Sequence, residues 1–171
     1  VALLRARGLR IGPVAVARGF ENARWPGRFQ VVAEKGRVLV LDGAHNVPAM
    51  RAFLETWDSF SSKSRPGAAD ALFIAGMLAD KDVDGMLDLL ASRARRAVAV
   101  RADSPRALGA ADLARRMEAR GIEVVARAEN AREALQAWEA DGAGTAALCG
   151  SFYLVGDALK SLAARRPGGR A

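Results

Sequence analysis

Apolar residues recur at helical spacing in five stretches of the chain. In the clearest of them, positions i, i+3, i+4 and i+7 are apolar, which is the pattern of a helix with one buried face. These clearest stretches are residues 50–57, 83–90 and 131–138. The spacing is weaker over residues 108–120, and it returns in residues 152–164. The sequence therefore predicts five amphipathic helices.

Short apolar runs lie between these helices. They cover residues 38–41, 71–75, 97–100, 122–126 and 145–149, without a regular alternation of polar and apolar positions. Continuous apolar runs of this length are typical of strands that are covered on both faces. Strands and helices that alternate along a chain favour right-handed crossovers and a mainly parallel sheet between helices.

One further strand is expected to run antiparallel. Residues 29–41 contain two strand-like runs joined by Glu34-Lys35-Gly36-Arg37, and a glycine in such a short connection is a hairpin signal. We therefore expect an α/β fold whose mainly parallel sheet carries one antiparallel strand at its edge.

The same pattern divides the chain into segments. Residues 1–22 are broken by glycine and proline, and we expect them to be the tail of a preceding domain plus a linker. The chain starts without Met, in what resembles the middle of a helix, so we expect it to be part of a longer protein. Residues 23–165 are expected to form one domain, with a polar loop at 61–70, and residues 166–171 a disordered tail.

Composition excludes several classes of protein. With 171 residues the chain can bury a substantial core. No apolar stretch approaches the ~20 residues of a membrane span, and the start lacks the apolar core of a signal peptide. Cys149 is the single cysteine and His45 the single histidine, so an internal disulfide is excluded and a zinc site lacks ligands. We expect a cytoplasmic protein with no membrane partner.

The charge is strongly positive. The formal net charge is +7 and the isoelectric point about 10.6, and a clustered basic face is the usual signature of nucleic-acid binding. Here the 26 lysines and arginines are spread over every segment instead of forming a cluster. We attribute the charge to an arginine-rich composition and expect no nucleic-acid partner.

Polar side chains collect after four of the predicted strands. The loops are residues 42–46, 76–82, 101–106 and 150–151. In an open parallel sheet, ligands bind at the carboxyl ends of the strands, which share one edge. The four loops bring carboxylates, cations, an imidazole, an amide and a hydroxyl to that edge. A polar ligand site is therefore expected there.

Each of these side chains also has a purely structural explanation. Asn46 and Ser151 precede predicted helices and would serve as helix caps, as would Asp80 or Asp82 for the helix that follows them. His45 would serve equally well as a structural residue. The chain lacks the standard phosphate loop, the dinucleotide-binding glycine motif and the nucleophile elbow. We therefore do not expect it to catalyse a reaction alone.

Five segments together resemble a known family. They are WPGRFQVV (25–32), LDGAHNVPAM (41–50), GMLADKD (76–82), ADSPRAL (102–108) and CGSFYLVGDAL (149–159). In order and spacing they are similar to the C-terminal domain of folylpolyglutamate synthase/dihydrofolate synthase, in the Mur ligase superfamily. The resemblance implies a Rossmann-like three-layer sandwich with a six-stranded sheet. It also implies a larger N-terminal domain, which binds ATP and Mg²⁺ and of which residues 1–22 would be the tail.

The family's reaction implies a ligase. ATP phosphorylates a carboxylate of dihydropteroate or of a folate, and the amine of L-glutamate then attacks the acyl phosphate. By this resemblance Arg28 would reach the nucleotide phosphates, and Asp42 would bind the ribose or orient its own loop. Asn46 would lie between the nucleotide and glutamate sites.

The glutamate site is implied in the same way. His45, Lys81 and Ser151 would contact the incoming L-glutamate, Lys81 and Ser151 through its carboxylates. Arg106 matches an arginine of the family, but the resemblance gives it no role. The alternative hypothesis is a stand-alone Rossmann-like module that binds a small anion at the same edge.

Overall fold

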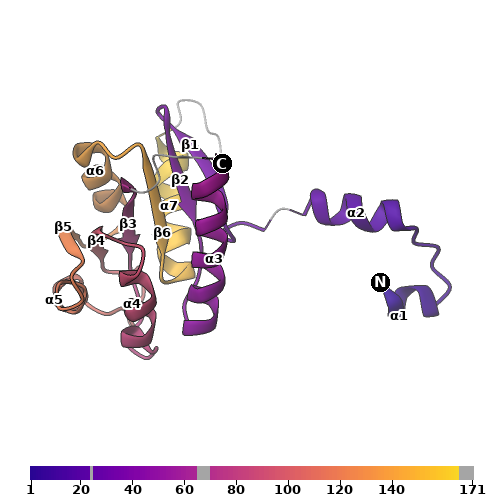
Figure 1. Ribbon diagram of the computed structural model, residues 1–171, viewed down its shortest axis with the longest axis horizontal. Coiled ribbons are helices and arrows are strands. Elements are labelled where there is room, and N and C mark those ends of the chain that lie inside the picture. Colours follow the sequence, from indigo (N-terminus) through magenta and orange to yellow (C-terminus); the bar gives the residue numbers. More distant parts are fainter. Residues whose placement is uncertain (24, 65–69, 166–171) are drawn as a thin grey trace.

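The predicted apolar runs and the hairpin form one six-stranded sheet in the computed structural model (Figure 1). The structure describes residues 1–23, 25–64 and 70–165. The strands are β1 Gln30–Glu34, β2 Arg37–Leu41, β3 Leu72–Ala75, β4 Arg96–Val100, β5 Glu123–Ala128 and β6 Thr145–Cys149. Their order is β1-β2-β6-β3-β4-β5. Only β1 is antiparallel to its neighbour, so the predicted sheet with an antiparallel edge strand is confirmed.

Helices cover both faces of the sheet. The described helices that pack on it are α3 Val47–Ser64, α4 Val83–Ala91, α5 Ala110–Glu118, α6 Ala131–Asp141 and α7 Phe152–Ala164. Along β2, Val38 and Val40 belong to the core under α3, α4 and α5. Leu39 and Leu41 belong to the core under α6 and α7. Because both faces are buried there, the central strands β2, β3, β4 and β6 are almost wholly apolar, whereas the edge strands β1 and β5 are partly exposed and carry polar residues. The predicted three-layer sandwich is confirmed.

Helix α3 is longer than the sequence predicts. It continues to Ser64, so the expected polar loop over residues 61–70 starts too early. The serines stay in the helix because their hydroxyls bond back to carbonyls of the preceding turn: Ser61 to Asp58 and Ser62 to Ser59. These bonds satisfy polar groups that would otherwise favour a loop. The remainder of the predicted loop, at 65–69, lies outside the described residues.

The predicted hairpin joins β1 to β2. Lys35 and Gly36 connect the strands with positive φ angles of 49° and 78°. Two successive positive φ angles are the signature of the tight turn that matches the twist of paired strands, and glycine adopts them without strain. Since β1 runs back along β2, its first residue lies at the carboxyl edge of the parallel strands.

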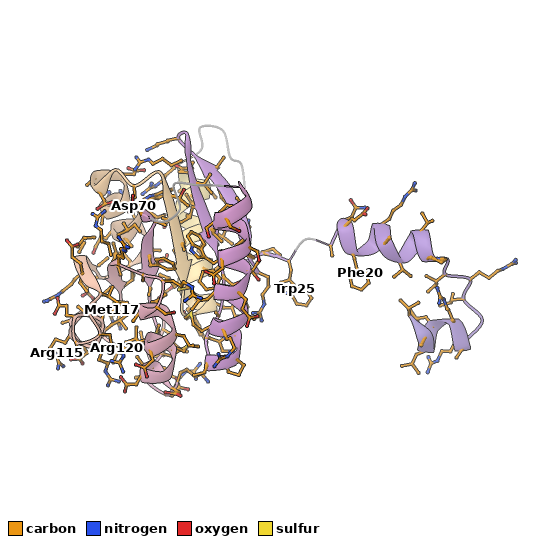
Figure 2. All side chains as sticks on the ribbon, in the orientation of Figure 1. Phe20, Trp25, Asp70, Arg115, Met117 and Arg120 are labelled. Atoms are coloured by element: carbon orange, nitrogen blue, oxygen red, sulfur yellow. The ribbon has the colours of Figure 1, made fainter. Side chains whose placement is uncertain are left out.

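Two helices precede the sheet. They are α1 Ala2–Ala6 and α2 Pro13–Glu21, and neither contains a buried residue. Figure 1 shows them set apart from the sheet, and Figure 2 shows Phe20 on α2 and Trp25 on the segment between α2 and the sheet. Phe20 is 76% exposed and Trp25 75%. None of the described helices is long and apolar enough to cross a membrane. The disordered tail expected at 166–171 lies outside the described residues.

Candidate functional site

The loops named in the sequence analysis meet at the carboxyl ends of the parallel strands. We call this end of the sheet the rim. It comprises residues 25–29, 42–46, 76–82, 101–108 and 150–153. The loops after β2, β3, β4 and β6 share this edge because those strands are mutually parallel. The turn before β1 joins them because Gln30 pairs with Leu41 in the antiparallel register.

Asp42 ties two rim segments together. Its side chain is buried, and its Oδ2 accepts a hydrogen bond from the Phe29 backbone N–H at 2.8 Å. Its Oδ1 accepts one from the Ala44 N–H, also at 2.8 Å. The Gly43 N–H donates to the Gly27 carbonyl at 2.7 Å. Of the two roles considered for Asp42, these contacts support the orienting one.

Three other polar residues of the rim are helix caps. The Asn46 side-chain oxygen accepts from the Ala49 N–H at 2.8 Å, at the start of α3. Asp82 accepts from the Gly85 N–H at 2.9 Å and caps α4. Ser151 accepts from the Leu154 N–H at 3.1 Å and caps α7. The structural explanation is therefore correct for all three. Ser151 is 1% exposed.

A depression of about 230 Å³ lies in the rim. Its lining residues come from four loops: His45, Leu78, Lys81, Arg106, Ser151, Phe152 and Tyr153. A short antiparallel bridge between Leu78 and Ala107 holds the loop after β3 against the loop after β4. Thus His45, Lys81 and Ser151, which the sequence assigns to one ligand, lie around one hollow.

Asp80 is the counter-ion of both cations in this depression. Its Oδ2 accepts from Arg106 Nη1 at 2.8 Å and lies 3.7 Å from Lys81 Nζ. Asp80 is not itself among the lining residues, so the depression presents two cations to a ligand. Such a set is suited to a small ligand that carries more than one negative charge.

The His45 imidazole has a defined orientation. Its Nδ1 lies 2.9 Å from the Gly43 carbonyl oxygen, which can only accept a hydrogen bond. In the neutral ring Nδ1 therefore carries the proton, and Nε2 is left as an acceptor. The other face of the site is aromatic: the His45 and Phe152 ring centroids are 5.7 Å apart.

Arg28 reaches the same aromatic ring. Its guanidinium carbon lies 4.7 Å from the Phe152 centroid, so Phe152 links Arg28 to the depression. Sequence reasoning did not single out Phe152, Tyr153 or Leu78. The one sequence signal for Phe152 and Tyr153 is weak: both directly follow a serine that could cap a helix. In the structure they are 39% and 47% exposed.

The rim offers no reactive thiol. Cys149 ends β6 directly below it, and its side chain is fully buried. Burial, and to a smaller extent the charge of Asp42, raise the pKa of Cys149 well above its usual range. Among the described residues there is also no cluster of three or more histidine, cysteine or acidic side chains that could hold a metal ion. The rim is equipped for binding charge.

Most of this chain matches a known protein family. Residues 27–152 match the family described as "Mur ligase, glutamate ligase domain". This chain belongs to the Mur ligase family. The matched segment of this Mur ligase domain includes every residue that lines the depression except Tyr153.

Relatives of this Mur ligase domain include folate enzymes. The dihydrofolate synthase/folylpolyglutamate synthase of Escherichia coli (strain K12) is 34% identical over 175 residues, which cover 99% of this chain and 38% of that protein. A probable bifunctional folylpolyglutamate synthase/dihydropteroate synthase of Haloferax volcanii is 37% identical over 92 residues, 53% of this chain and 10% of that protein. The chain therefore spans well under half the length of these relatives.

Solved structures of Mur ligase relatives share the fold. Escherichia coli FolC in complex with DHPP and ADP superposes with a TM-score of 0.80 and 28% identity, over 96% of this chain and 38% of that one. A bifunctional folylpolyglutamate synthase/dihydrofolate synthase with Mn, AMPPNP and L-glutamate bound superposes with a TM-score of 0.71 and 29% identity, over 94% of this chain and 37% of that one. The expected C-terminal domain architecture of this family is thereby confirmed.

Proposed function

We propose that this chain is the C-terminal part of an ATP-dependent ligase that adds L-glutamate to dihydropteroate, to folylpolyglutamate, or to both. The match to the glutamate ligase domain and the folate enzymes among the relatives support this assignment. The single observation that carries it at the level of residues is the convergence of His45, Lys81 and Ser151 on one depression.

The reaction has two steps. First, the terminal phosphoryl group of ATP moves to a carboxylate oxygen of the pterin substrate, which yields an acyl phosphate and ADP. The amine nitrogen of L-glutamate then bonds to the acyl carbon, the carbon–oxygen bond to phosphate breaks, and the amine releases a proton. Phosphate is a good leaving group, so positioning and neutralisation of charge supply most of the remaining catalysis.

The rim is assigned to two ligands. Lys81 and the Ser151 hydroxyl would bind glutamate carboxylates, with His45 beside them. The cap bond uses only the Ser151 oxygen as an acceptor, so its O–H remains a donor. A half-buried ammonium next to a carboxylate ligand forms a strong, charge-assisted hydrogen bond.

We assign the nucleotide to the region of Arg28, which Phe152 links to the depression. Arg28 would bind phosphate oxygens, because a guanidinium donates two parallel hydrogen bonds to them. The side-chain nitrogen of Asn46 is not used by the helix cap and would donate between the two ligands. Asp42 would act from behind, by holding the Arg28 turn against the loop after β2.

The remaining machinery is assigned to an N-terminal domain. The chain spans 38% of its Escherichia coli relative, and α1 and α2 bury no residue of their own. We therefore propose that these helices pack on that domain, and that it supplies the phosphate loop and the ligands of Mg²⁺. A divalent ion would spread the charge of the transferred phosphoryl group when bound. The lone buried thiol of Cys149 fits a reducing compartment, and we place the enzyme in the cytoplasm.

Kinetics on the full-length gene product test this function. With ATP and Mg²⁺ present, glutamate addition would be measured with dihydropteroate and with a folylpolyglutamate as acceptors. We expect ATP-dependent addition to at least one acceptor, and no turnover by this chain alone. A full-length product without a phosphate-loop domain that binds small anions and does not ligate would favour the stand-alone binding module instead.

A further inference from the structure

Phe152 lies where Gly43 leaves room for its ring. A Cβ on Gly43 would overlap the aromatic carbons of Phe152, and one on Gly27 would lie 3.5 Å from the ring. The absence of a side chain at Gly43 lets the ring pack against the turns that Asp42 joins, whereas the contact at Gly27 is an ordinary van der Waals one. Its other side remains 39% exposed at the rim. Three separate segments thus define the position of the Phe152 ring: the start of α7 and the turns at Gly27 and Gly43.

Arg28 depends on this ring. Its guanidinium lies over the Phe152 face at 4.7 Å, and within the described part of the chain its side chain has no hydrogen bond or ion pair. An arginine side chain has several rotatable bonds, and an unrestrained one loses that freedom when it binds a ligand. Stacking on an aromatic face removes part of this cost before the ligand arrives.

His45 depends on the ring far less. Its imidazole also lies beside Phe152, but its Nδ1 is fixed independently by the Gly43 carbonyl at 2.9 Å. The two residues that touch the ring are assigned to different ligands, Arg28 to the nucleotide and His45 to glutamate. A change at Phe152 should therefore separate the two ligands kinetically.

We propose that Phe152 is a positioning residue that holds the Arg28 guanidinium ready for the nucleotide phosphates. This inference rests on the proposed ligase function and adds a residue to it. Phe152 acts through Arg28 and does not itself contact the reacting atoms. Positioning of Arg28 requires the aromatic face of Phe152 and not merely its apolar volume. The attraction between a cation and a ring depends on the electron distribution of the ring.

Three variants of the full-length enzyme test the proposal. Phe152→Leu keeps an apolar side chain but removes the aromatic face, and we expect the KM for ATP to rise by about threefold to tenfold. The KM for glutamate should change by less than about twofold. Phe152→Tyr, which keeps the face, should recover the unsubstituted KM for ATP. Gly43→Ala keeps the ring but displaces it, and should resemble Phe152→Leu.

A double-mutant cycle with Arg28→Met tests the route of the effect. If Phe152 acts through Arg28, then Phe152→Leu should have almost no further effect on the KM for ATP in the Arg28→Met background. An equal effect in both backgrounds, or equal changes for ATP and glutamate, would overturn the proposal. So would a Phe152→Tyr variant as impaired as Phe152→Leu. Melting temperatures of all variants would be measured alongside.

The placement of the ring is checked without turnover. His45 is the sole histidine, so its ring protons give unique NMR signals in this chain. Phe152→Leu should shift them, because the aromatic ring current acts at the 5.7 Å centroid distance. Unchanged signals would overturn the inference. An active enzyme with unaltered Phe152→Leu kinetics would overturn it while leaving the ligase function intact, whereas an inactive full-length protein would overturn both.

Discussion

The two ends of the sheet use charge differently. At the end opposite the rim, a groove of about 570 Å³ lies beside α6, α7 and the β1–β2 turn, lined by Lys35, Arg132, Gln136, Glu139, Lys160, Ser161, Ala164 and Arg165. Glu139 accepts from Lys35 Nζ at 3.1 Å and from Arg165 Nη1 at 2.6 Å. Arg37 donates to the carbonyls of Trp138 and Glu139 near the end of α6. The fold itself uses these charges.

The depression in the rim is smaller, and two of the rim's cations are loosely held. Lys81 is 3.7 Å from its only described counter-ion, and Arg28 rests on a ring with no acceptor among the residues described. If volume and the number of charged lining residues alone decided, the opposite groove would be chosen as the ligand site. Cations gathered from separate loops, with a long ion pair at Lys81 and none described at Arg28, instead support the rim as the proposed ligand site.

The largest expected effect is at Lys81. Lys81→Ala in the full-length enzyme should raise the KM for glutamate by roughly 10- to 100-fold, because a charge-assisted hydrogen bond worth about 1.5–3 kcal/mol is lost. The KM for ATP should change far less. Steady-state kinetics with each substrate varied in turn would measure both constants.

The control for Lys81 is stability. Its side chain is 35% exposed and its contact with Asp80 is long, so the free energy of unfolding should change by less than about 0.5 kcal/mol. Equal rises in KM for glutamate and ATP would remove Lys81 from the glutamate site. A large loss of stability would mean that Lys81 stabilises the fold. The rim and the opposite groove would then no longer differ in how they use their cations.

Much of the fold and part of the rim can be predicted from the sequence. Continuous apolar runs predicted buried strands, and parallel strands place their carboxyl ends together whatever the loops do in detail. A capping role for Asn46, for Ser151 and for Asp80 or Asp82 was one of the two alternatives open from the sequence, because capping depends on residues within one turn of a helix. Local patterns such as these are fixed by the backbone and are therefore readable from sequence.

What the sequence missed depends on contacts between loops. The Asp80–Arg106 pair joins residues 26 positions apart, and its formation requires the bridge between the two loops that carry them. Phe152 acquires its place only because Gly43, far away in the chain, has no side chain. The late end of α3 was missed for another reason, since serines that bond back into the helix look like loop residues in a sequence.

An intermediate effect is expected at Asp42, where fold and site meet. Asp42→Asn keeps one acceptor oxygen but turns an amide N–H toward the second backbone donor, either Phe29 or Ala44. A buried donor left without its partner costs about 1–3 kcal/mol. Urea unfolding of this chain should show that loss of stability. A change below about 0.5 kcal/mol would mean that Asp42 does not clamp the two turns, and its carboxylate would then be available for the nucleotide.

The smallest effect is expected at the opposite groove, from Glu139→Gln. Lys35 and Arg165, against the opposing effect of desolvation, hold the pKa of Glu139 below its ordinary value of 4.5. A carboxylate whose pKa is lowered on folding stabilises the protein above its unfolded-state pKa, and this contribution disappears as pH falls through the lower, folded-state value. The side chain is 27% exposed, so the loss on substitution near neutral pH should be below about 1 kcal/mol and should shrink with added salt. Urea unfolding at neutral and at acidic pH measures it, and the variant should keep the KM for both substrates. A changed KM for glutamate in Glu139→Gln would mean that the larger groove, and not the rim alone, takes part in binding.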